Sequence, residues 1–591
     1  MRTVLIAATA LFAVVAGNAQ SGACSCGTAP QNLAGRKLEP YANAPSDMRP
    51  FTNFTRPYYE NYTTTPEYNG AAADVAPVAL KDIDEVSIGF LGPVEDNKDM
   101  ALGRAMLHGA ELAIGEANAR GGYCGKPFRL KIHNDGAVWG ASSNEIVKMV
   151  YDDKVWAMLG SISGDSTHIA LRVSLRAELP MVNSAATDPT IPETIIPWIL
   201  TSIQDDRVQS YTLARRIYTD LGLKRVALLR VNDRYGRFGV LKFRDASRRL
   251  GHPLIIEQKF MPGDTDFERA LRVINDSRVD AIVLWADAAP AGMILKQMRA
   301  LGMKQPVFGA ARVIGSDLLK TAGPAAEGLE VVYPFDPTRD DPSWLNFQKR
   351  YTAAYKEPVD SFSAMSYDTM NILLDSICHA GLNRGKIRDA LYSVEHFKGV
   401  TGEMIFDPNA KNIAPMYLGT VKDGKVTYQR YTMEKPYASL KEARVGYEGP
   451  PTETTPTSES IVGLFGPGAD KLAESLQKPG LRVIGVASEE AWGKSSTALV
   501  DLIYQPNVIG LIATDRASAH LAGQLVVKTM VPLIALSSDK TLTTANIPWI
   551  FRLEANTPPA EALRHYTEAV KEAGANRARI QAYFATRLPQ P

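Results

Sequence analysis

The stretch that decides the fold is Leu159–Pro189, LGSISGDSTHIALRVSLRAELPMVNSAATDP. The apolar strand Val155–Leu159 runs into a Gly/Ser turn, and a helix leads to a second apolar strand, Leu179–Val182, and a small-residue turn. This order predicts parallel strands whose carboxyl ends share one edge, where open α/β sheets bind ligands. Free N–H groups at a helix start, beside Ser and Thr hydroxyls, suit a carboxylate or another small anion.

Outward from this stretch, short apolar strands alternate with helical patterns from Val86 to Gly309. Strict alternation predicts an α/β fold with doubly wound parallel sheets. The pattern restarts after Asp205, which predicts two Rossmann-like lobes in tandem. Two further helices and an antiparallel hairpin follow, and we expect the hairpin strands at Met404–Phe406, Tyr417–Lys422 and Lys425–Arg430.

The chain begins with the features of an export signal. Met1-Arg2 precedes an apolar run, Val4–Val15, and Gly17-Asn18-Ala19 offers a small-x-small cleavage site. Export to the periplasm would place the protein in an oxidising compartment. Cys24 offers an alternative, a lipoprotein anchor, although the usual apolar residue three positions before the cysteine is missing.

Composition changes along the chain predict the domain organisation. We expect a signal peptide at 1–19, an extended Pro/Tyr-rich tether at 20–84, a two-lobed unit at 85–447, a Pro/Thr linker at 448–460 and a further unit at 461–591. Lobe 1 is expected at about 85–203 plus 334–395, and lobe 2 at about 204–333 plus 396–447. The tether is rich in tyrosine, so it could instead dock on the folded part.

Charge and cysteine content exclude several classes of function. The net charge of +1 argues against nucleic-acid binding. The four cysteines show no metal or haem spacing, and we expect no metal and no cofactor. Cys124 and Cys378 could pair or remain separate thiols, and the sequence alone leaves both options open.

The C-terminal unit repeats the first lobe. Motifs such as Trp139-Gly140 and the helix segment Ser166–Ala170 return in constant register about 350 residues later, as Trp492-Gly493 and Ser518–Ala522. The repeat stops after one more helix and an expected strand, Arg579–Phe584, so a copy of the second lobe is missing.

At this point the chain resembles the type I periplasmic binding proteins of the branched-chain amino-acid and amide group. The resemblance covers about Glu85 to Tyr431. Its motifs, in order, are IGFLGP, EANARGG, SAATDP, SIQDDR, NDRYGRFG, PGDTDF and TGEMIFDPN. It implies two lobes joined by three crossovers that close on a small-molecule ligand, and a membrane permease of the ABC type as partner. We place the crossovers near 203–206, 333–336 and 398–401.

The resemblance implies a set of ligand-binding residues. Thr187 and Ala185 match the turn that holds a ligand's carboxylate and amine. Gly164 stands where amino-acid binders usually have a Ser, so Ser163 or Ser166 would have to supply a hydroxyl. Tyr235 matches a cleft-facing Tyr of the second lobe.

The opposite side of the cleft departs from the family pattern. Amino-acid binders place a Glu near Ala311 to pair with an ammonium, but this chain has Arg312 beside it. Either Asp287 takes that role, or the ligand has no ammonium and Arg312 clamps a second carboxylate. Trp139 near the cleft mouth could form one wall of the ligand site, although the matching Trp492 in the repeat favours a packing role.

No enzyme motif is complete. Gly160–Gly164 reads G-x-x-S-G instead of the G-x-S-x-G nucleophile elbow, so we expect no catalytic residues and no enzyme activity. The leading hypothesis is an exported solute-binding protein for an ABC transporter. Its alternative is an envelope interaction or ligand-sensing module that has lost uptake. A membrane-receptor sensor domain is disfavoured because no apolar span follows the fold.

The repeat lacks the anchoring residues of its parent. By register, Asp515-Arg516 replaces Ser163-Gly164, and Asp539 replaces Thr187. A carboxylate at the anchoring turn would repel an anionic ligand. We therefore expect the repeat to bind no such ligand and to pack on the first unit or on an envelope partner.

Overall fold

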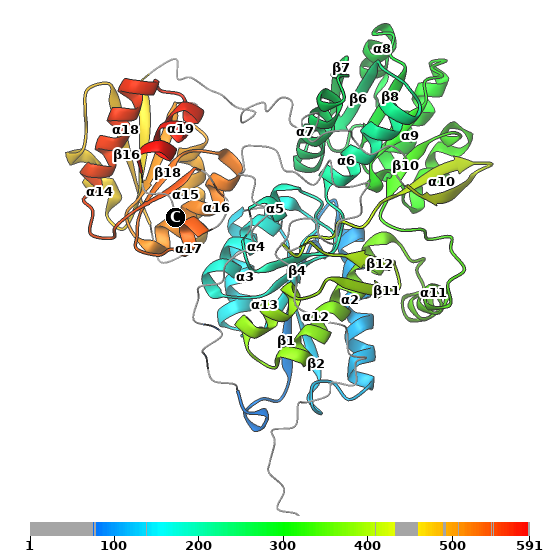
Figure 1. Ribbon diagram of the computed structural model, residues 1–591, viewed down its shortest axis with the longest axis horizontal. Helices are drawn as coiled ribbons and strands as arrows, with labels where there is room; N and C mark the ends of the chain where they lie inside the picture. The colour runs from blue at the N-terminus through cyan, green and yellow to red at the C-terminus, as the bar shows by residue number, and fades with distance from the viewer. Residues whose placement is uncertain are drawn as a thin grey trace, which may run out of the picture.

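The computed structural model resolves most of the chain into three α/β units (Figure 1). It describes Ala72, Val75 and residues 78–136, 139–194, 196–407, 409–431, 459–488, 492–505, 507–544, 547 and 549–588. The expected signal peptide, Cys24 and the linker at 448–458 lie outside these residues, as does most of the tether. None of the helices in these ranges is long and apolar enough to cross a membrane.

Lobe 1 is built on a five-stranded parallel sheet of order β2-β1-β3-β4-β5. Strand β1, Val86–Gly92, lies between β2 and β3 and is buried along its whole length, as a strand covered on both faces must be. The other elements are α2 (Met100–Ala119), β2 (Phe128–Asn134), α3 (Trp139–Tyr151), β3 (Ala157–Gly160), α4 (Gly164–Ala177), β4 (Met181–Asn183), α5 (Thr190–Glu193) and β5 (Ile199–Thr201).

Lobe 2 carries a seven-stranded sheet of order β14-β13-β10-β9-β8-β6-β7. Its elements are α6 (Asp206–Ala214), a π-helical turn (Arg215–Asp220), β6 (Val226–Val231), α7 (Arg234–Arg249), β7 (Ile256–Phe260), α8 (Glu268–Asp276), β8 (Ala281–Trp285), α9 (Ala288–Ala300), β9 (Val307–Gly309), α10 (Ser316–Ala322) and β10 (Glu330–Tyr333). The hairpin β13 (Tyr417–Lys422) and β14 (Lys425–Arg430) completes one edge, antiparallel to β10. The doubly wound prediction is therefore confirmed for both lobes.

The chain returns to lobe 1 through α11 (Pro342–Tyr355), α12 (Ser361–Ala380) and α13 (Arg384–Tyr392). The next hairpin, β11 (His396–Gly399) with β12 (Gly402–Ile405), also belongs there, because Phe397 and Met404 pack in the lobe 1 core. Our prediction that 396 onward joins lobe 2, with Met404–Phe406 in its hairpin, is therefore wrong. The third crossover lies after Asn412, whose N–H donates to Thr201 O at the end of β5, and not at 398–401.

The three crossovers contact one another through buried polar groups. Gln204 Nε2 donates to Pro334 O at 3.4 Å and to Ala414 O at 3.3 Å, which joins all three segments. Beside it, Lys411 Nζ lies 2.8 Å from Asp205 Oδ2, and these side chains are only 3% and 1% exposed. The hinge therefore contains a buried ion pair between the first and third crossovers.

Two further features secure lobe 1. Cys124, in the turn after α2, and Cys378, in α12, are each disulfide-bonded. Asn383 Nδ2 donates to the carbonyls of Ala72 and Val75, at 2.9 Å and 3.1 Å. The described end of the N-terminal segment thus lies against lobe 1.

The C-terminal unit, hereafter the repeat module, has the sheet order of lobe 1, β16-β15-β17-β18-β19. Its elements are β15 (Ser460–Gly466), α14 (Ala469–Ser475), β16 (Leu481–Ala487), α15 (Trp492–Ile503), β17 (Val508–Ala513), α16 (Arg516–Thr529), β18 (Leu533–Leu536), α17 (Thr541–Thr544), β19 (Ile550–Leu553), α18 (Pro559–Ala573) and α19 (Arg577–Arg587). The strand expected at Arg579–Phe584 is wrong. That segment is helix α19, capped by Asn576, and it buries Ile580 and Phe584 at helical spacing.

The repeat module packs on lobe 1 (Figure 1). Helix α15 contacts α3, and α16 contacts α4. One continuous apolar core contains residues from both sides, among them Met149 and Val173 of lobe 1 and Leu499 and Leu525 of the module. The sequence predicts a partner for the apolar surface of the repeat, and lobe 1 of the same chain covers that surface.

Candidate functional site

A cavity of about 360 Å³ lies between the lobes, at the carboxyl ends of their strands. It is lined from lobe 1 by the loops after β1, β2, β3 and β4, and from lobe 2 by the start of α7 and the turn after β9. Of the predicted site residues, Ser163, Gly164, Thr187, Tyr235 and Arg312 line it. Ala185 and Asp287 do not line it, and the side chain of Trp139, the first residue of α3, lies outside the described part of the structure.

Ser163 and Gly164 form the start of α4. The Ser163 hydroxyl oxygen caps the helix by accepting from the N–H groups of Asp165 and Ser166, at 3.2 Å and 3.5 Å. A Cβ added at Gly164 would lie 2.7 Å from Asp188 Oδ2. A Ser at this position would place its Cβ against the Asp188 side chain, so position 164 offers the ligand only its backbone.

Thr187 lies on the turn after β4, and its hydroxyl hydrogen-bonds the carboxylate of Asp206. Ala185 is buried next to it, where its N–H donates to Asn183 Oδ1 at 3.1 Å. Thr187 therefore reaches the cavity directly, whereas Ala185 shapes the turn that presents it.

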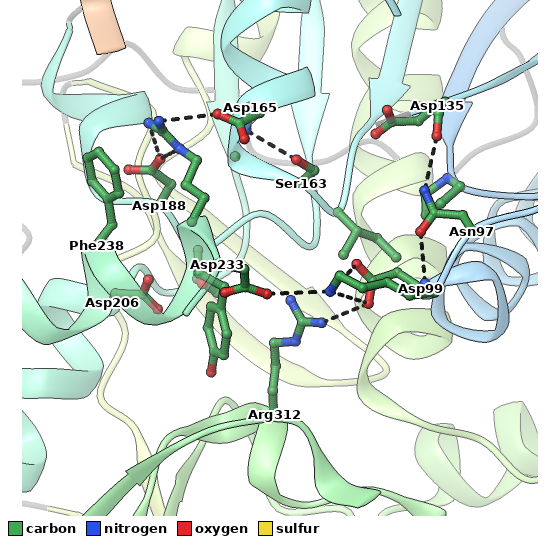
Figure 2. Close-up of a pocket in the computed structure, with 18 of the residues that line it drawn as sticks. Asn97, Asp99, Asp135, Ser163, Asp165, Asp188, Asp206, Asp233, Phe238 and Arg312 are labelled. Carbon is green, nitrogen blue, oxygen red and sulfur yellow. Dashed lines mark hydrogen bonds and ion pairs between the residues drawn. The ribbon is translucent and has the colours of Figure 1, made fainter. Parts of the chain in front are cut away.

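Arg312 does not stand free to clamp a second carboxylate. Its Nε lies 2.7 Å from Asp287 Oδ1 of lobe 2. Its Nη2 lies 3.3 Å from Asp99 Oδ1 of lobe 1 (Figure 2). Its guanidinium also stacks over the Tyr235 ring, 4.5 Å from the centroid. Burial lowers the pKa of Arg312, but Asp287 and Asp99 outweigh it and raise the pKa above the ordinary value.

A second arginine closes the cleft from lobe 2. Arg234, at the start of α7, lies 2.6 Å from Asp188 and 3.3 Å from Asp165 of lobe 1, the cluster drawn at the upper left of Figure 2. Burial acts against the charge of Asp188, but Arg234, His168 and the Thr190 hydroxyl lower its pKa to about 2. Lys98 and Asp233 add a fourth contact across the lobes, at 3.4 Å. These pairs hold the cleft in a closed arrangement.

Asp206 lines the cavity without an ion pair to any of the described residues, although Arg312 is close enough to act against the rise of its pKa. It is 1% exposed, lines the cavity at the first crossover and accepts only from Thr187 and from Gln209 Nε2 at 3.2 Å among the described residues. Burial raises its pKa well above the usual range, and Asp188 and Asp205 add to the rise. The Tyr235 hydroxyl is buried in the cavity wall with no hydrogen-bond partner in the described part of the chain. Burial, and then the nearby charge of Asp206, raise the pKa of Tyr235.

Apart from Arg312, sequence reasoning missed the charged residues of the cleft. The lining has seven aspartates against one lysine and two arginines. Asp188, Asp206 and Arg234 stand inside motifs quoted from the sequence, SAATDP, SIQDDR and NDRYGRFG. The sequence thus shows charged residues after the strands, where a ligand site is expected. It does not show which of them pair across the two lobes, because that depends on the closed arrangement.

The structure also shows which residues of lobe 1 the charged residues of the repeat correspond to. Asp515 caps α16 as Ser163 caps α4, as the register predicts. Asp539 lies 2.9 Å from His520, as Asp188 lies 3.8 Å from His168, and each Asp stands two residues before the following helix. Asp539 therefore corresponds to Asp188 and not to Thr187, which corrects the predicted register by one residue.

Comparison with known proteins agrees with this architecture. The family model described as periplasmic binding protein matches residues 85–425. A Leu/Ile/Val-binding protein homolog 2 of Brucella abortus is 23% identical over 350 residues, 58% of this chain and 93% of that protein. The Leu/Ile/Val-binding protein of Escherichia coli K12 is 25% identical over 255 residues, 43% of this chain and 68% of that protein.

Solved structures cover the same part of the chain. The branched-chain amino acid transporter substrate binding protein LivJ of Streptococcus pneumoniae, solved with isoleucine, is 25% identical and superposes with a TM-score of 0.54, over 59% of this chain and 100% of that one. A solute binding protein of R. palustris, solved with benzoate, has the same fold at 18% identity and a TM-score of 0.53, over 58% and 96% of the chains. The chain belongs to the periplasmic binding protein family, as a two-lobed solute-binding protein that carries a repeat of its own first lobe.

Proposed function

We propose that this protein captures a small solute bearing a cationic nitrogen and a carboxylate or amide, and delivers it to an ABC-type permease. The observation that carries the proposal is the placement of Asp206, Thr187 and the Tyr235 hydroxyl in one closed cavity with the start of α4. A buried carboxylate and an unpartnered hydroxyl are costly unless a ligand satisfies them. An ammonium group supplies donors and charge to both.

The opposite end of the ligand would lie at Ser163 and Gly164. The N-terminus of α4 lines the cavity at these two residues and offers a partial positive charge to a carboxylate or amide oxygen. The cavity of about 360 Å³ suits a compact solute, and named relatives bind leucine, isoleucine and valine. Asp206 thus takes the place of the Glu that this chain lacks near Ala311.

Export fits this function. The N-terminal sequence has the layout of a signal peptide, and disulfide-bonded cysteines such as Cys124 and Cys378 are typical of an oxidising compartment such as the periplasm. Capture there requires that the ligand bind the closed state better than the open state.

A matched panel of ligands tests the proposal by thermal shift. Each amino acid is compared with its amide and with the organic acid that lacks the amine. We expect amine-bearing compounds to raise the melting temperature and deaminated acids to leave it unchanged. Stabilisation by deaminated acids alone would remove the cationic nitrogen from the proposal, and stabilisation by no member of the panel would reject uptake of this class altogether.

Asp206→Asn should weaken binding of an amine-bearing ligand about 10- to 100-fold, because a hydrogen bond to a charged group contributes about 1.5–3 kcal/mol. Titration calorimetry measures the loss. Asp276→Asn, a substitution on the exposed face of α8, is the control and should bind like the wild type. Equal affinity of the Asp206→Asn variant would show that the ligand's nitrogen lies elsewhere.

A further inference from the structure

The surface of lobe 1 formed by α3 and α4 packs against the equivalent surface of the repeat module. Helix α15 is the counterpart of α3, and α16 is the counterpart of α4, and each contacts its own counterpart. Such pairing of like with like is what a two-fold symmetric dimer of lobe 1 would have. The chain therefore carries a pseudo-symmetric dimer within one molecule.

The apolar positions of this surface occur in both copies. Helices α3 and α15 both begin with Trp-Gly, so Ile146 and Met149 correspond to Leu499 and Leu502. All four side chains are buried in the shared core. On apolar contacts alone, a second copy of lobe 1 could compete with the module for the same surface.

One contact breaks the symmetry. Arg172 of α4 is fully buried against α16, and a Cβ added at Gly523 would lie 2.3 Å from its Nη2. None of its three guanidinium nitrogens has a hydrogen-bond partner among the described residues. The charge that faces it is Asp539 of the module, which opposes the effect of burial; the net result is that the pKa of Arg172 is lowered to about 10.

A second copy of lobe 1 would not accept Arg172. Helices α4 and α16 each have 14 residues after their caps, so Leu171 stands in α4 where Gly523 stands in α16. A leucine side chain there would displace the guanidinium from its buried position, because even a Cβ would lie 2.3 Å from Nη2. The counterpart of Asp539 is Asp188, which already pairs with Arg234 at 2.6 Å. Arg172 would therefore lose both its space and its compensating charge.

We propose that the contact between Arg172 and Gly523 makes the repeat module, and not a second copy of the chain, the partner of the α3–α4 surface. The module then occupies the surface through which lobe 1 would otherwise self-associate. Because the linker holds the module near this surface, docking within the chain is also favoured by a high effective concentration. The protein works as a monomer with an internal partner.

The test uses the full chain with a protease site introduced between 448 and 458, cut after folding. We expect the cut wild-type module to co-elute with the two-lobed part as a single 1:1 complex in light scattering. Gly523→Leu should release the module, and the two-lobed part should stay monomeric because Arg172 still blocks self-association. Arg172→Gln combined with Gly523→Leu should restore co-elution, since the shorter side chain leaves room for leucine.

Three results would overturn the proposal. The first is a wild-type chain that dimerises through α3 and α4, detected as a dimer that Ile146→Asp abolishes. The second is co-elution of the Gly523→Leu module at wild-type affinity. The third is homodimerisation of the two-lobed part released from Gly523→Leu. The circular dichroism spectrum of the released Gly523→Leu module shows whether it is still folded. If the double variant also fails to redock and this module is unfolded, the loss of binding comes from misfolding, which counts against a selective contact.

Discussion

Replacement of Lys411 by Met should lower the free energy of unfolding by about 3–5 kcal/mol, because it leaves the buried carboxylate of Asp205 without its cation. The two groups lie 2.8 Å apart and are almost fully buried where the first and third crossovers meet. Asp205 also caps α6, since its Oδ1 accepts from the N–H groups of Arg207 and Val208. The lost pair would therefore disturb both the hinge and the start of lobe 2.

Urea unfolding followed by circular dichroism measures this loss as a shift of the midpoint. Lys422→Met, at the exposed end of β13, removes the same charge from the surface and should change stability by less than about 0.5 kcal/mol. The double variant Asp205→Asn with Lys411→Met should recover part of the loss, since no charge is then left unpaired. A Lys411→Met variant as stable as the wild type would mean that Asp205 is neutral or hydrated at the hinge.

The sequence predicts the fold well where the signal is local. Val86–Leu91 and Val155–Leu159 are continuous apolar runs, and a parallel strand buried on both faces requires that pattern. The segment Arg579–Phe584 shows the limit, because a short run of mixed residues fits a strand or a helix equally well. The third crossover is similar, since only packing of Phe397 in the lobe 1 core reveals where the chain changes lobes.

The site is predictable only in part, for a related reason. Ser163, Thr187 and Tyr235 stand in turns that follow strands, so sequence order alone brings them to one edge. The pairing of Arg312 with Asp99 joins two lobes and residues 213 positions apart in the chain. A pair between the lobes depends on the closed arrangement, and no local pattern encodes it.

Arg234→Met should raise the dissociation constant for the ligand about 10- to 100-fold, mainly by disfavouring the closed state. Arg234 comes from lobe 2 and contacts Asp188 and Asp165 of lobe 1, so its charge is compensated only when the lobes meet. In the variant, closure would bury Asp188 without a cation, and truncating one partner of a buried charge pair costs about 2–5 kcal/mol. The apparent affinity falls with the fraction of molecules that can close.

Small-angle X-ray scattering of the ligand-free and ligand-saturated protein, together with calorimetry, separates this effect from loss of a direct contact. We expect the ligand-free Arg234→Met variant to be more open than the wild type, yet to close to the same dimensions at saturation. Arg237→Met, on the exposed side of α7, is the matched control and should change neither quantity.

The pH dependence of the variant provides a second test of the Arg234–Asp188 pair. Because Arg234 helps to lower the pKa of Asp188 to about 2, its loss should raise that pKa, so acid should begin to protonate Asp188 at a higher pH in the variant than in the wild type. A variant that binds and closes like the wild type would mean that the cleft closes without this ion pair, and that ligand contacts alone hold the lobes together.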